Sequence, residues 1–254
     1  MILLHRLTPF AALAVLVTSF GLLIYSPLHP LAVMATACAI IIFLLARLLR
    51  WEWQRFAFWV FFGMPIFFLV SSFSFFLLLE ALSAMWFLSI AVVFGFWLYT
   101  ENLFMFYHLP RSYQPYALEH LSLVLGIASV FFFTSSAYGT QLFLGLPLWV
   151  PSIAIFWIVL LLTLGIFWVS KIEKDVSLFY ALSGAFLMTQ MYLVLAFLPT
   201  SFVVNAVAFA TLLYVYMGLS RVHVLDRLSG SVLRRYLGIG SFFLLLIFAT
   251  AKWV

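Results

Sequence analysis

The sequence predicts an all-α integral-membrane protein, a polytopic bundle of about nine transmembrane helices that forms a single domain over residues 1–254. Three observations predict this class. Hydrophobic side chains make up 67% of the 254 residues and charged side chains only 7%, whereas soluble domains average about 45–50% and about 25%. The 31 phenylalanines indicate a surface that faces lipid. The apolar segments are also continuous, which favours helices over the alternating strands of a membrane barrel.

Nine apolar segments of membrane-spanning length follow one another along the chain. Most are separated by proline or charge, which a helix in lipid tolerates least. The apolar stretch 56–99 would extend about 66 Å as one helix, roughly twice the ~30 Å hydrocarbon thickness, so we expect it to reverse near Glu80. The first segment lacks a convincing signal-peptidase site, and we expect it to remain as a span. The expected spans are residues 8–25, 31–49, 56–79, 82–99, 117–138, 148–170, 176–198, 202–219 and 236–253.

Lys and Arg are distributed asymmetrically over the loops between these spans. With the N-terminus inside, each of the 12 Lys and Arg except Lys252 falls on the cytoplasmic side, where multi-pass proteins concentrate them. We therefore predict an N-in, C-out protein of the plasma (inner) membrane of a bacterium or archaeon, with an organelle membrane as the less favoured alternative. Because topology explains the net charge of +5, nucleic acid is not an expected partner. The expected partners are membrane lipids and, through Phe-rich faces, another membrane protein.

The sequence also disfavours several kinds of chemistry. The single cysteine, Cys38, excludes an internal disulfide and a Cys-rich zinc site. A Walker phosphate loop, a Gly-x-Ser-x-Gly elbow and a His-Glu-x-x-His motif are absent from the sequence. We therefore expect neither a cofactor nor a bound metal ion.

The loop between the fourth and fifth expected spans carries most of the candidate binding residues. Glu101 interrupts an apolar run that otherwise continues beyond it, so Glu101 lies inside the membrane boundary if the fourth helix continues. Such a group marks a functional site by default, because a charge at mid-bilayer costs about 2.5–3.5 kcal/mol or more. Antiparallel neighbours would bring the cluster together to bind an anion or relay a proton, and a divalent metal is the least favoured of the possible ligands. The alternative is structural, with Arg111 neutralising Glu101 or Glu119 at solvated helix ends. The candidates are Glu101, His108, Arg111, Glu119 and His120.

Three further polar residues lie in or beside the expected spans. Glu80 lies at an outer turn, where it either contacts Lys252 or is an ordinary solvated turn residue. Gln190 and Asn205, on the seventh and eighth spans, are expected to hydrogen-bond to each other rather than to hold a substrate. Pro65 is expected to kink the third span, because it removes a backbone donor there.

A second cytoplasmic loop, residues 221–235, has apolar side chains at near-helical spacing. This pattern predicts a short helix lying on the membrane surface. Its arginines would then bind anionic lipid, whereas the alternative is an ordinary positively charged cytoplasmic loop.

Three functions remain open at this point. The first is a small transport or membrane-assembly component that uses the polar cluster around Glu101. The second is an intramembrane enzyme or binder of a lipid-linked substrate, with Glu119 or His120 as the base and Arg111 on a phosphate. The third is a structural subunit of a membrane complex. A transport protein needs a polar path, an enzyme needs a closed pocket, and a structural subunit needs neither.

Overall fold

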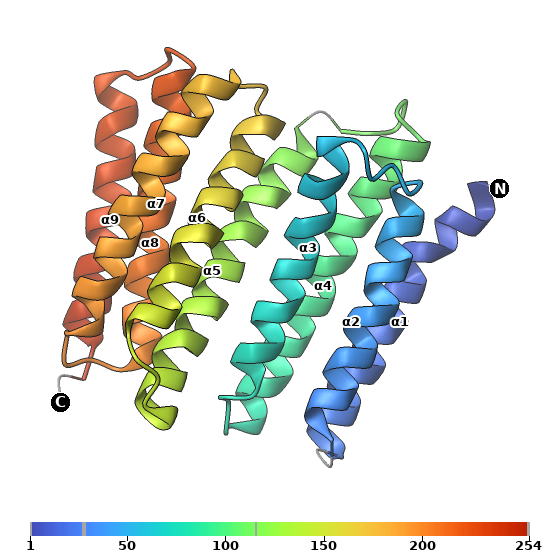
Figure 1. Ribbon diagram of the computed structural model, residues 1–254, viewed down its shortest axis with the longest axis horizontal. Coiled ribbons are helices and arrows are strands. Elements are labelled where there is room, and N and C mark those ends of the chain that lie inside the picture. The colour runs from blue at the N-terminus through green and yellow to red at the C-terminus, as the bar shows by residue number, and fades with distance from the viewer. Residues whose placement is uncertain (1, 27–28, 115, 253–254) are drawn as a thin grey trace. The chain divides into compact units, whose positions relative to one another are not determined.

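The computed structural model describes residues 2–26, 29–114 and 116–252, and the regular elements in these ranges are all α-helices (Figure 1). The nine helices found there are each long and apolar enough to cross a membrane. This confirms the predicted multi-pass helical class. The helices are α1 (Ile2–Tyr25), α2 (Pro30–Leu48), α3 (Phe56–Phe76), α4 (Leu82–His108), α5 (Ala117–Leu144), α6 (Trp149–Val169), α7 (Lys174–Ala196), α8 (Phe202–Val224) and α9 (Gly230–Thr250).

Five helices extend five or more residues beyond their expected spans, among them α1, which begins at Ile2, and α8, which ends at Val224. α4 continues through polar residues to His108, α5 continues to Leu144, and α9 begins at Gly230. The predicted surface helix in residues 221–235 is therefore wrong, because this segment is divided between the end of α8, a short turn and the start of α9. Ser229 explains the early start, since its hydroxyl caps α9 by accepting a hydrogen bond from the Val232 N–H at 3.4 Å.

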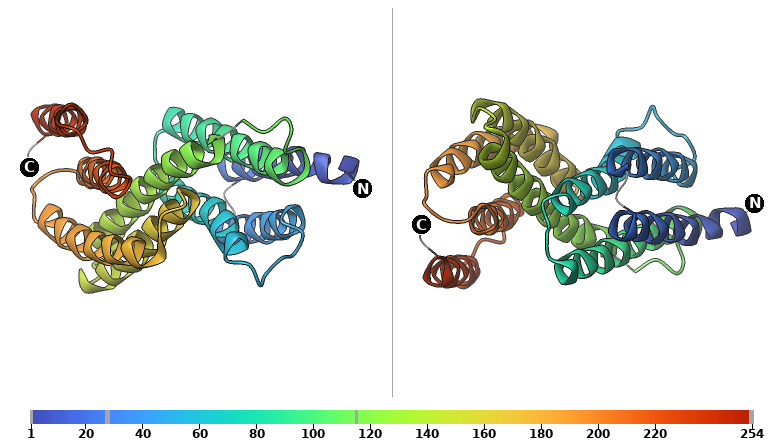
Figure 2. Two further views of the ribbon diagram at one scale, coloured as in Figure 1. Left: turned by 90° about the horizontal axis from the view of Figure 1, so that it is seen from above. Right: turned by 90° about the horizontal axis from the view of Figure 1, so that it is seen from below.

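The chain divides into two compact units, unit 1 (Met1–Ser129) and unit 2 (Val130–Val254). In unit 1, α1 packs against α2 and α4, and α3 packs against the same two helices (Figure 2). In unit 2, α6 packs along α7, α7 along α8, and α8 along α9. The organisation of the whole chain as a single domain stays a prediction.

Pro65 lies buried inside α3 without ending the helix. Its ring removes the N–H that would bond to the carbonyl four residues earlier, that of Phe61. The hydroxyl of Tyr99, a fully buried residue of α4, lies 3.4 Å from that carbonyl oxygen and donates to it. A side chain of α4 thus satisfies the acceptor that the proline leaves open. The predicted kink itself stays a prediction.

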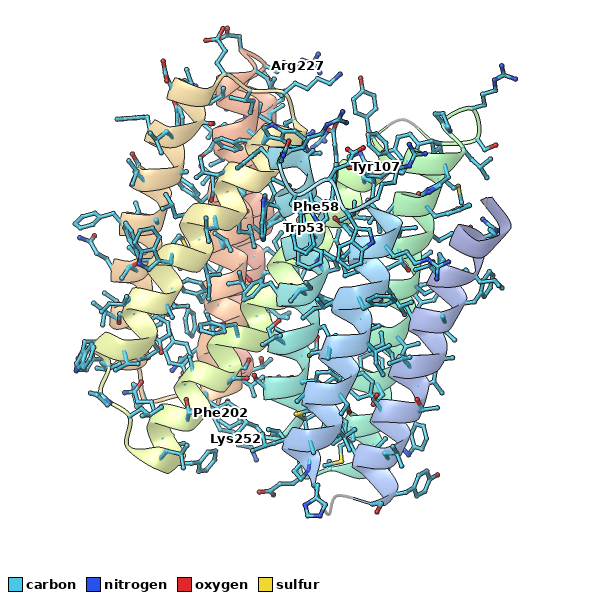
Figure 3. All side chains as sticks on the ribbon, turned by 45° about the vertical axis from the view of Figure 1, so that its right-hand side comes forward. Trp53, Phe58, Tyr107, Phe202, Arg227 and Lys252 are labelled. Carbon is cyan, nitrogen blue, oxygen red and sulfur yellow. The ribbon has the colours of Figure 1, made fainter. Side chains whose placement is uncertain are left out.

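The loop between α2 and α3 attaches to the end of α4. Its backbone turns at Arg50 and Trp51, which have φ angles of 56° and 55°. The Arg50 guanidinium then donates to the Tyr107 carbonyl at 3.1 Å, a favourable place for a cation because helix C-termini carry partial negative charge. Trp53 lies against Phe58 at 5.5 Å between ring centroids (Figure 3). The first contact thus joins this loop to the last turn of α4, and the second joins it to the start of α3.

In unit 2, glycines allow bulky side chains to approach neighbouring helices closely. A methyl group at Gly184 of α7 would overlap the ring of Tyr216 on α8, and one at Gly218 of α8 would overlap Tyr236 on α9. The Tyr216 hydroxyl also donates to the Tyr180 carbonyl of α7 at 2.5 Å. The α7–α8 and α8–α9 contacts therefore depend on the absence of a side chain at these two positions.

Candidate functional site

Glu101 lies inside α4, two turns before the end of that helix. Its exposed fraction is 7%, which makes it the only buried carboxylate among the described residues. Carboxylates are rarely buried unless they are paired, because burial removes the water that stabilises the charge. The surroundings of this side chain are therefore the candidate functional site.

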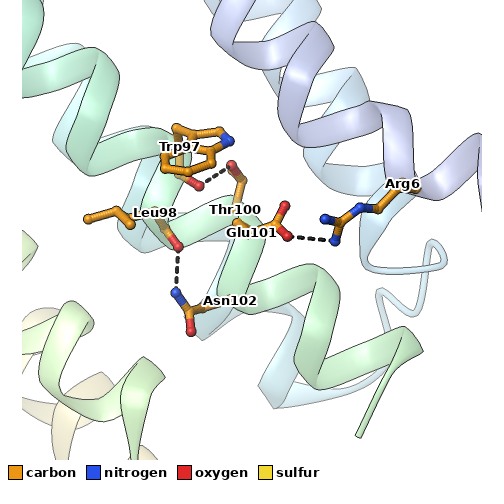
Figure 4. A network of polar contacts seen from close by, with 6 residues as sticks. All are labelled: Arg6, Trp97, Leu98, Thr100, Glu101 and Asn102. Atoms are coloured by element: carbon orange, nitrogen blue, oxygen red, sulfur yellow. Dashed lines mark hydrogen bonds and ion pairs between the residues drawn. The ribbon is translucent and has the colours of Figure 1, made fainter. Parts of the chain in front are cut away.

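The first helix supplies the partner of Glu101. Arg6 Nη1 of α1 donates to Glu101 Oε1 at 2.5 Å (Figure 4). The Arg6 guanidinium also lies 5.2 Å from the centroid of the Phe104 ring, within cation–π range. The Arg6 side chain is 43% exposed, whereas that of Glu101 is 10% exposed. In this charge-assisted bond, Glu101 is thus nearly buried and Arg6 remains partly exposed.

The second oxygen of the carboxylate makes no hydrogen bond to the described residues. Glu101 Oε2 is buried, and it has no hydrogen-bond partner in the described part of the chain. The same holds for the indole N–H of Trp97, which lies one turn earlier on α4 and so shares the helix face of Glu101 (Figure 4). Buried polar atoms are almost always paired, and an exception calls for an explanation. The Glu101 oxygen can accept a hydrogen bond from a small polar group or take up a proton, and the Trp97 N–H can donate a hydrogen bond to such a group.

His108 continues the same face at the end of α4. Its ring stacks on that of Phe104, with 5.1 Å between centroids and 10° between planes. Glu101, Phe104 and His108 are spaced three and four residues apart, which places them along one stripe of the helix. The structure therefore brings two of the predicted candidates together with Arg6 around one aromatic ring.

The other three candidates lie apart from this stripe. Arg111 in the α4–α5 loop and His120 in α5 are exposed, and Glu119 is half-buried. No hydrogen bond joins Glu101 to Arg111 or to His120 in the ranges that the structure describes. The carboxylate of Glu101 pairs with Arg6, whereas the structural alternative named Arg111 as the partner of Glu101 or Glu119. The binding of a ligand by any of the five candidates stays a prediction.

Sequence reasoning missed Arg6, which it counted only as a marker of topology. The available signal was its position, since a lone arginine in the first turns of an apolar span needs either water or an anion. The choice of Glu101 as that anion depends on the packing of α1 against α4, which no local pattern encodes.

The remaining polar candidates have simpler surroundings. Asn205 is buried, and its Oδ1 accepts a hydrogen bond from the Thr200 hydroxyl at 2.5 Å. Gln190 is exposed on α7, and in the described residues it does not bond to Asn205. The predicted Gln190–Asn205 hydrogen bond is therefore wrong, because the capping turn of α8 satisfies Asn205 locally. Glu80 and Lys252 are both exposed, and their pairing stays a prediction. Within unit 2, Lys252 lies at the end opposite to Arg227 (Figure 3).

Among the described residues, no three or more His, Cys, Asp or Glu side chains are grouped so that they could hold a metal ion. The chemistry of the site is that of the Arg6–Glu101 pair, a buried carboxylate with one oxygen bonded to Arg6 and the other without a hydrogen bond in the described part of the chain. No family model, curated protein or solved structure matches this chain.

Proposed function

We propose that this protein is a small transport component of the plasma membrane, in which the Glu101 carboxylate takes up and releases a proton or another cation. One observation carries the proposal: Glu101 is buried in a membrane-spanning helix with one oxygen on Arg6 and the other unbonded. Ionisable groups inside spans commonly mark ion and proton paths. The predicted N-in orientation would place this site near the cytoplasmic surface.

The arrangement supports a two-state exchange. While Glu101 is ionised, its bond to Arg6 ties α1 to α4. A proton arriving at the open Oε2 breaks no existing hydrogen bond, and it removes the charge that holds the guanidinium. Because the Arg6 side chain is already 43% exposed, it can then turn toward water. Neutralising the carboxylate would thus weaken the contact between the two helices, which is the movement that a transport cycle requires.

The enzyme alternative receives less support. It requires Arg111 to hold a phosphate while Glu119 or His120 acts as a base within a pocket. Arg111 and His120 are both exposed, and neither bonds to the buried carboxylate. The function that fits the observed contacts best is therefore charge exchange at Glu101.

Glu101→Gln is expected to abolish pH-driven charge movement. In liposomes adsorbed to a sensor electrode, a rapid pH change should displace charge across the membrane that holds the wild-type protein. Gln keeps the size of the side chain and an oxygen that accepts from Arg6, but it cannot bind and release a proton in this pH range. We expect the signal to fall to that of protein-free liposomes.

Glu119→Gln is the matched control, because it removes a carboxylate from the neighbouring helix without touching the Arg6 contact. It should retain the wild-type signal. A Glu101→Gln protein that moves as much charge as the wild type would show that another group carries the proton.

A second candidate, a membrane-assembly component, rests on the outward face of α7. The exposed side chains along this face recur at helical spacing and include three phenylalanines, a serine and an amide. An amide that faces lipid leaves its donors and acceptor without water, so it favours a hydrogen bond to another helix. Because a glutamine both donates and accepts, a second copy of this chain is a fitting partner. The face consists of Phe179, Ser183, Phe186, Gln190 and Val194 of α7 together with Phe197, the residue that follows its last turn.

Gln190→Leu is therefore expected to weaken self-association about three- to tenfold, as the loss of an interhelical hydrogen bond of roughly 0.6–1.5 kcal/mol implies. Energy transfer between donor- and acceptor-labelled copies, measured while the protein is diluted in liposomes, reports this change. Thr250→Leu on α9 is the control, since the Thr250 hydroxyl is bonded within its own helix. If the wild type and Gln190→Leu self-associate equally, the α7 face is not the contact between copies.

A further inference from the structure

A cavity of about 380 Å³ opens in unit 2 where three helices end together. It lies beside the end of α6, the start of α7 and the end of α8, and no part of the Arg6–Glu101 site contributes to it. Its volume falls within the range of small-molecule sites, about 300–1,000 Å³. Because these helices are membrane spans, their ends place the cavity at the depth of lipid headgroups.

Two sharp helix ends form part of its wall. Lys171 after α6 and Asp226 after α8 both have left-handed backbones, with φ angles of 58° and 53°. In each case the next N–H reaches back to a carbonyl of the helix, Ile172 to Phe167 at 3.1 Å and Arg227 to Val222 at 3.0 Å. Both helices therefore stop abruptly at the cavity, and their C-terminal ends add partial negative charge there.

The charged side chains of the cavity are of both signs. Lys171 is the basic residue of its lining, and Glu173 and Asp226 are the acidic ones. The ion pairs Arg6–Glu101 and Arg55–Glu52 both lie in unit 1, away from this cavity. The two carboxylates and the C-terminal ends of α6 and α8 favour a bound cation, whereas Lys171 and the N-terminal end of α7 favour an anion. A ligand that carries both charges, a short distance apart, satisfies all of these groups.

The rest of the lining is aromatic and apolar. Tyr180 is held by the hydroxyl of Tyr216, which donates to its carbonyl, and the His223 ring approaches Tyr180 edge-on at 6.1 Å. Ile172 and Val176 extend the wall with apolar side chains. A charged cavity with an apolar wall at the edge of a bilayer suits a headgroup whose glycerol and acyl portions remain in the membrane.

We propose that this cavity binds the phosphoethanolamine headgroup of a membrane phospholipid. Lys171 binds the phosphate, and Glu173 and Asp226 accept hydrogen bonds from the primary ammonium. A trimethylated ammonium cannot donate such bonds, so the site discriminates against phosphocholine lipids. The inference does not depend on Glu101 and stands or falls apart from the proposed transport function.

Native mass spectrometry of the detergent-solubilised protein tests the proposal. The protein is incubated with equal amounts of phosphatidylethanolamine, phosphatidylcholine and phosphatidylglycerol of the same acyl chains, and the retained lipids are counted. We expect wild type to retain phosphatidylethanolamine about tenfold over the other two, the ratio that one lost charge-assisted hydrogen bond implies. Glu173→Gln/Asp226→Asn should abolish this preference, and Lys171→Gln should reduce total retention.

Asp175→Asn is the matched control, because Asp175 lies in the first turn of α7, between Glu173 and Val176, but outside the cavity lining. It should behave as wild type. Soluble phosphoethanolamine, added as a competitor, identifies the source of the ligand: displacement supports the headgroup alone, and continued retention supports the intact lipid. Equal retention of all three lipids by wild type, or an effect of Asp175→Asn equal to that of the double variant, would overturn the proposal.

Discussion

Arg6→Leu is expected to lower the stability of the folded protein by about 1–3 kcal/mol, which corresponds to a decrease of roughly 2–12 °C in the unfolding temperature. The substitution leaves the buried Glu101 carboxylate without its counter-charge. Removing one partner of a buried pair costs more than the pair is worth, because the remaining charge has lost both water and its partner. The lower end of the range reflects the partial exposure of Arg6. Thermal unfolding in detergent, followed by tryptophan fluorescence, measures the change.

The double variant Arg6→Leu/Glu101→Leu should recover much of the loss, since it leaves no stranded charge. Arg55→Leu is the matched control. Arg55 also pairs with a glutamate, Glu52, at 2.9 Å, but its side chain is 72% exposed, and such surface pairs contribute little. If Arg6→Leu unfolds at the temperature of Arg55→Leu, the Arg6–Glu101 bond does not contribute to folding.

Gly184→Ala and Gly218→Ala are each expected to destabilise unit 2 by about 1–3 kcal/mol, the usual cost of forcing extra volume into a packed interior. The added methyl group would overlap a tyrosine ring in each case, Tyr216 for Gly184 and Tyr236 for Gly218. The Tyr216 ring has little room to move, because its hydroxyl is bonded to α7. Thermal unfolding of each variant measures the effect.

Gly63→Ala provides the control for these two variants. Gly63 also lies within a membrane-spanning helix, α3, but nothing lies within 4 Å of an added methyl group. Alanine is the better helix former, so this variant should be as stable as the wild type or up to about 1 kcal/mol more stable. If all three alanine variants change the unfolding temperature equally, the close contacts at Gly184 and Gly218 do not determine stability.

The helical class and the positions of the spans could be predicted because both follow from local composition. An apolar run of suitable length in lipid has no alternative to a helix, since its backbone must satisfy its own hydrogen bonds. The ends were harder to predict where polar residues continue a helix, as at Glu101 in α4 and at Arg234 in α9. A partner on another helix decides the first case and a serine cap decides the second.

The candidate site was predictable only in part. The depth of Glu101 marked it as costly, and the four-residue spacing of Phe104 and His108 agrees with their stacking. The structural alternative named Arg111, which is near in sequence, as the partner of Glu101 or Glu119, whereas the partner that Glu101 has, Arg6, belongs to the first helix. Helix–helix packing in membranes depends on shape along the whole interface, so the pairing of α1 with α4 cannot be read from either helix alone.

The position of the boundary between the two units has a consequence for synthesis. Unit 1 ends at Ser129, in the middle of α5, so the ribosome must deliver the fifth helix before the first unit is complete. Chains emerge from the N-terminus, and earlier segments assemble first. Arg6 and Glu101 lie on the first and fourth helices, and both enter the membrane before α5. Their bond is therefore a contact that can join the early helices while the nascent protein is still being extended.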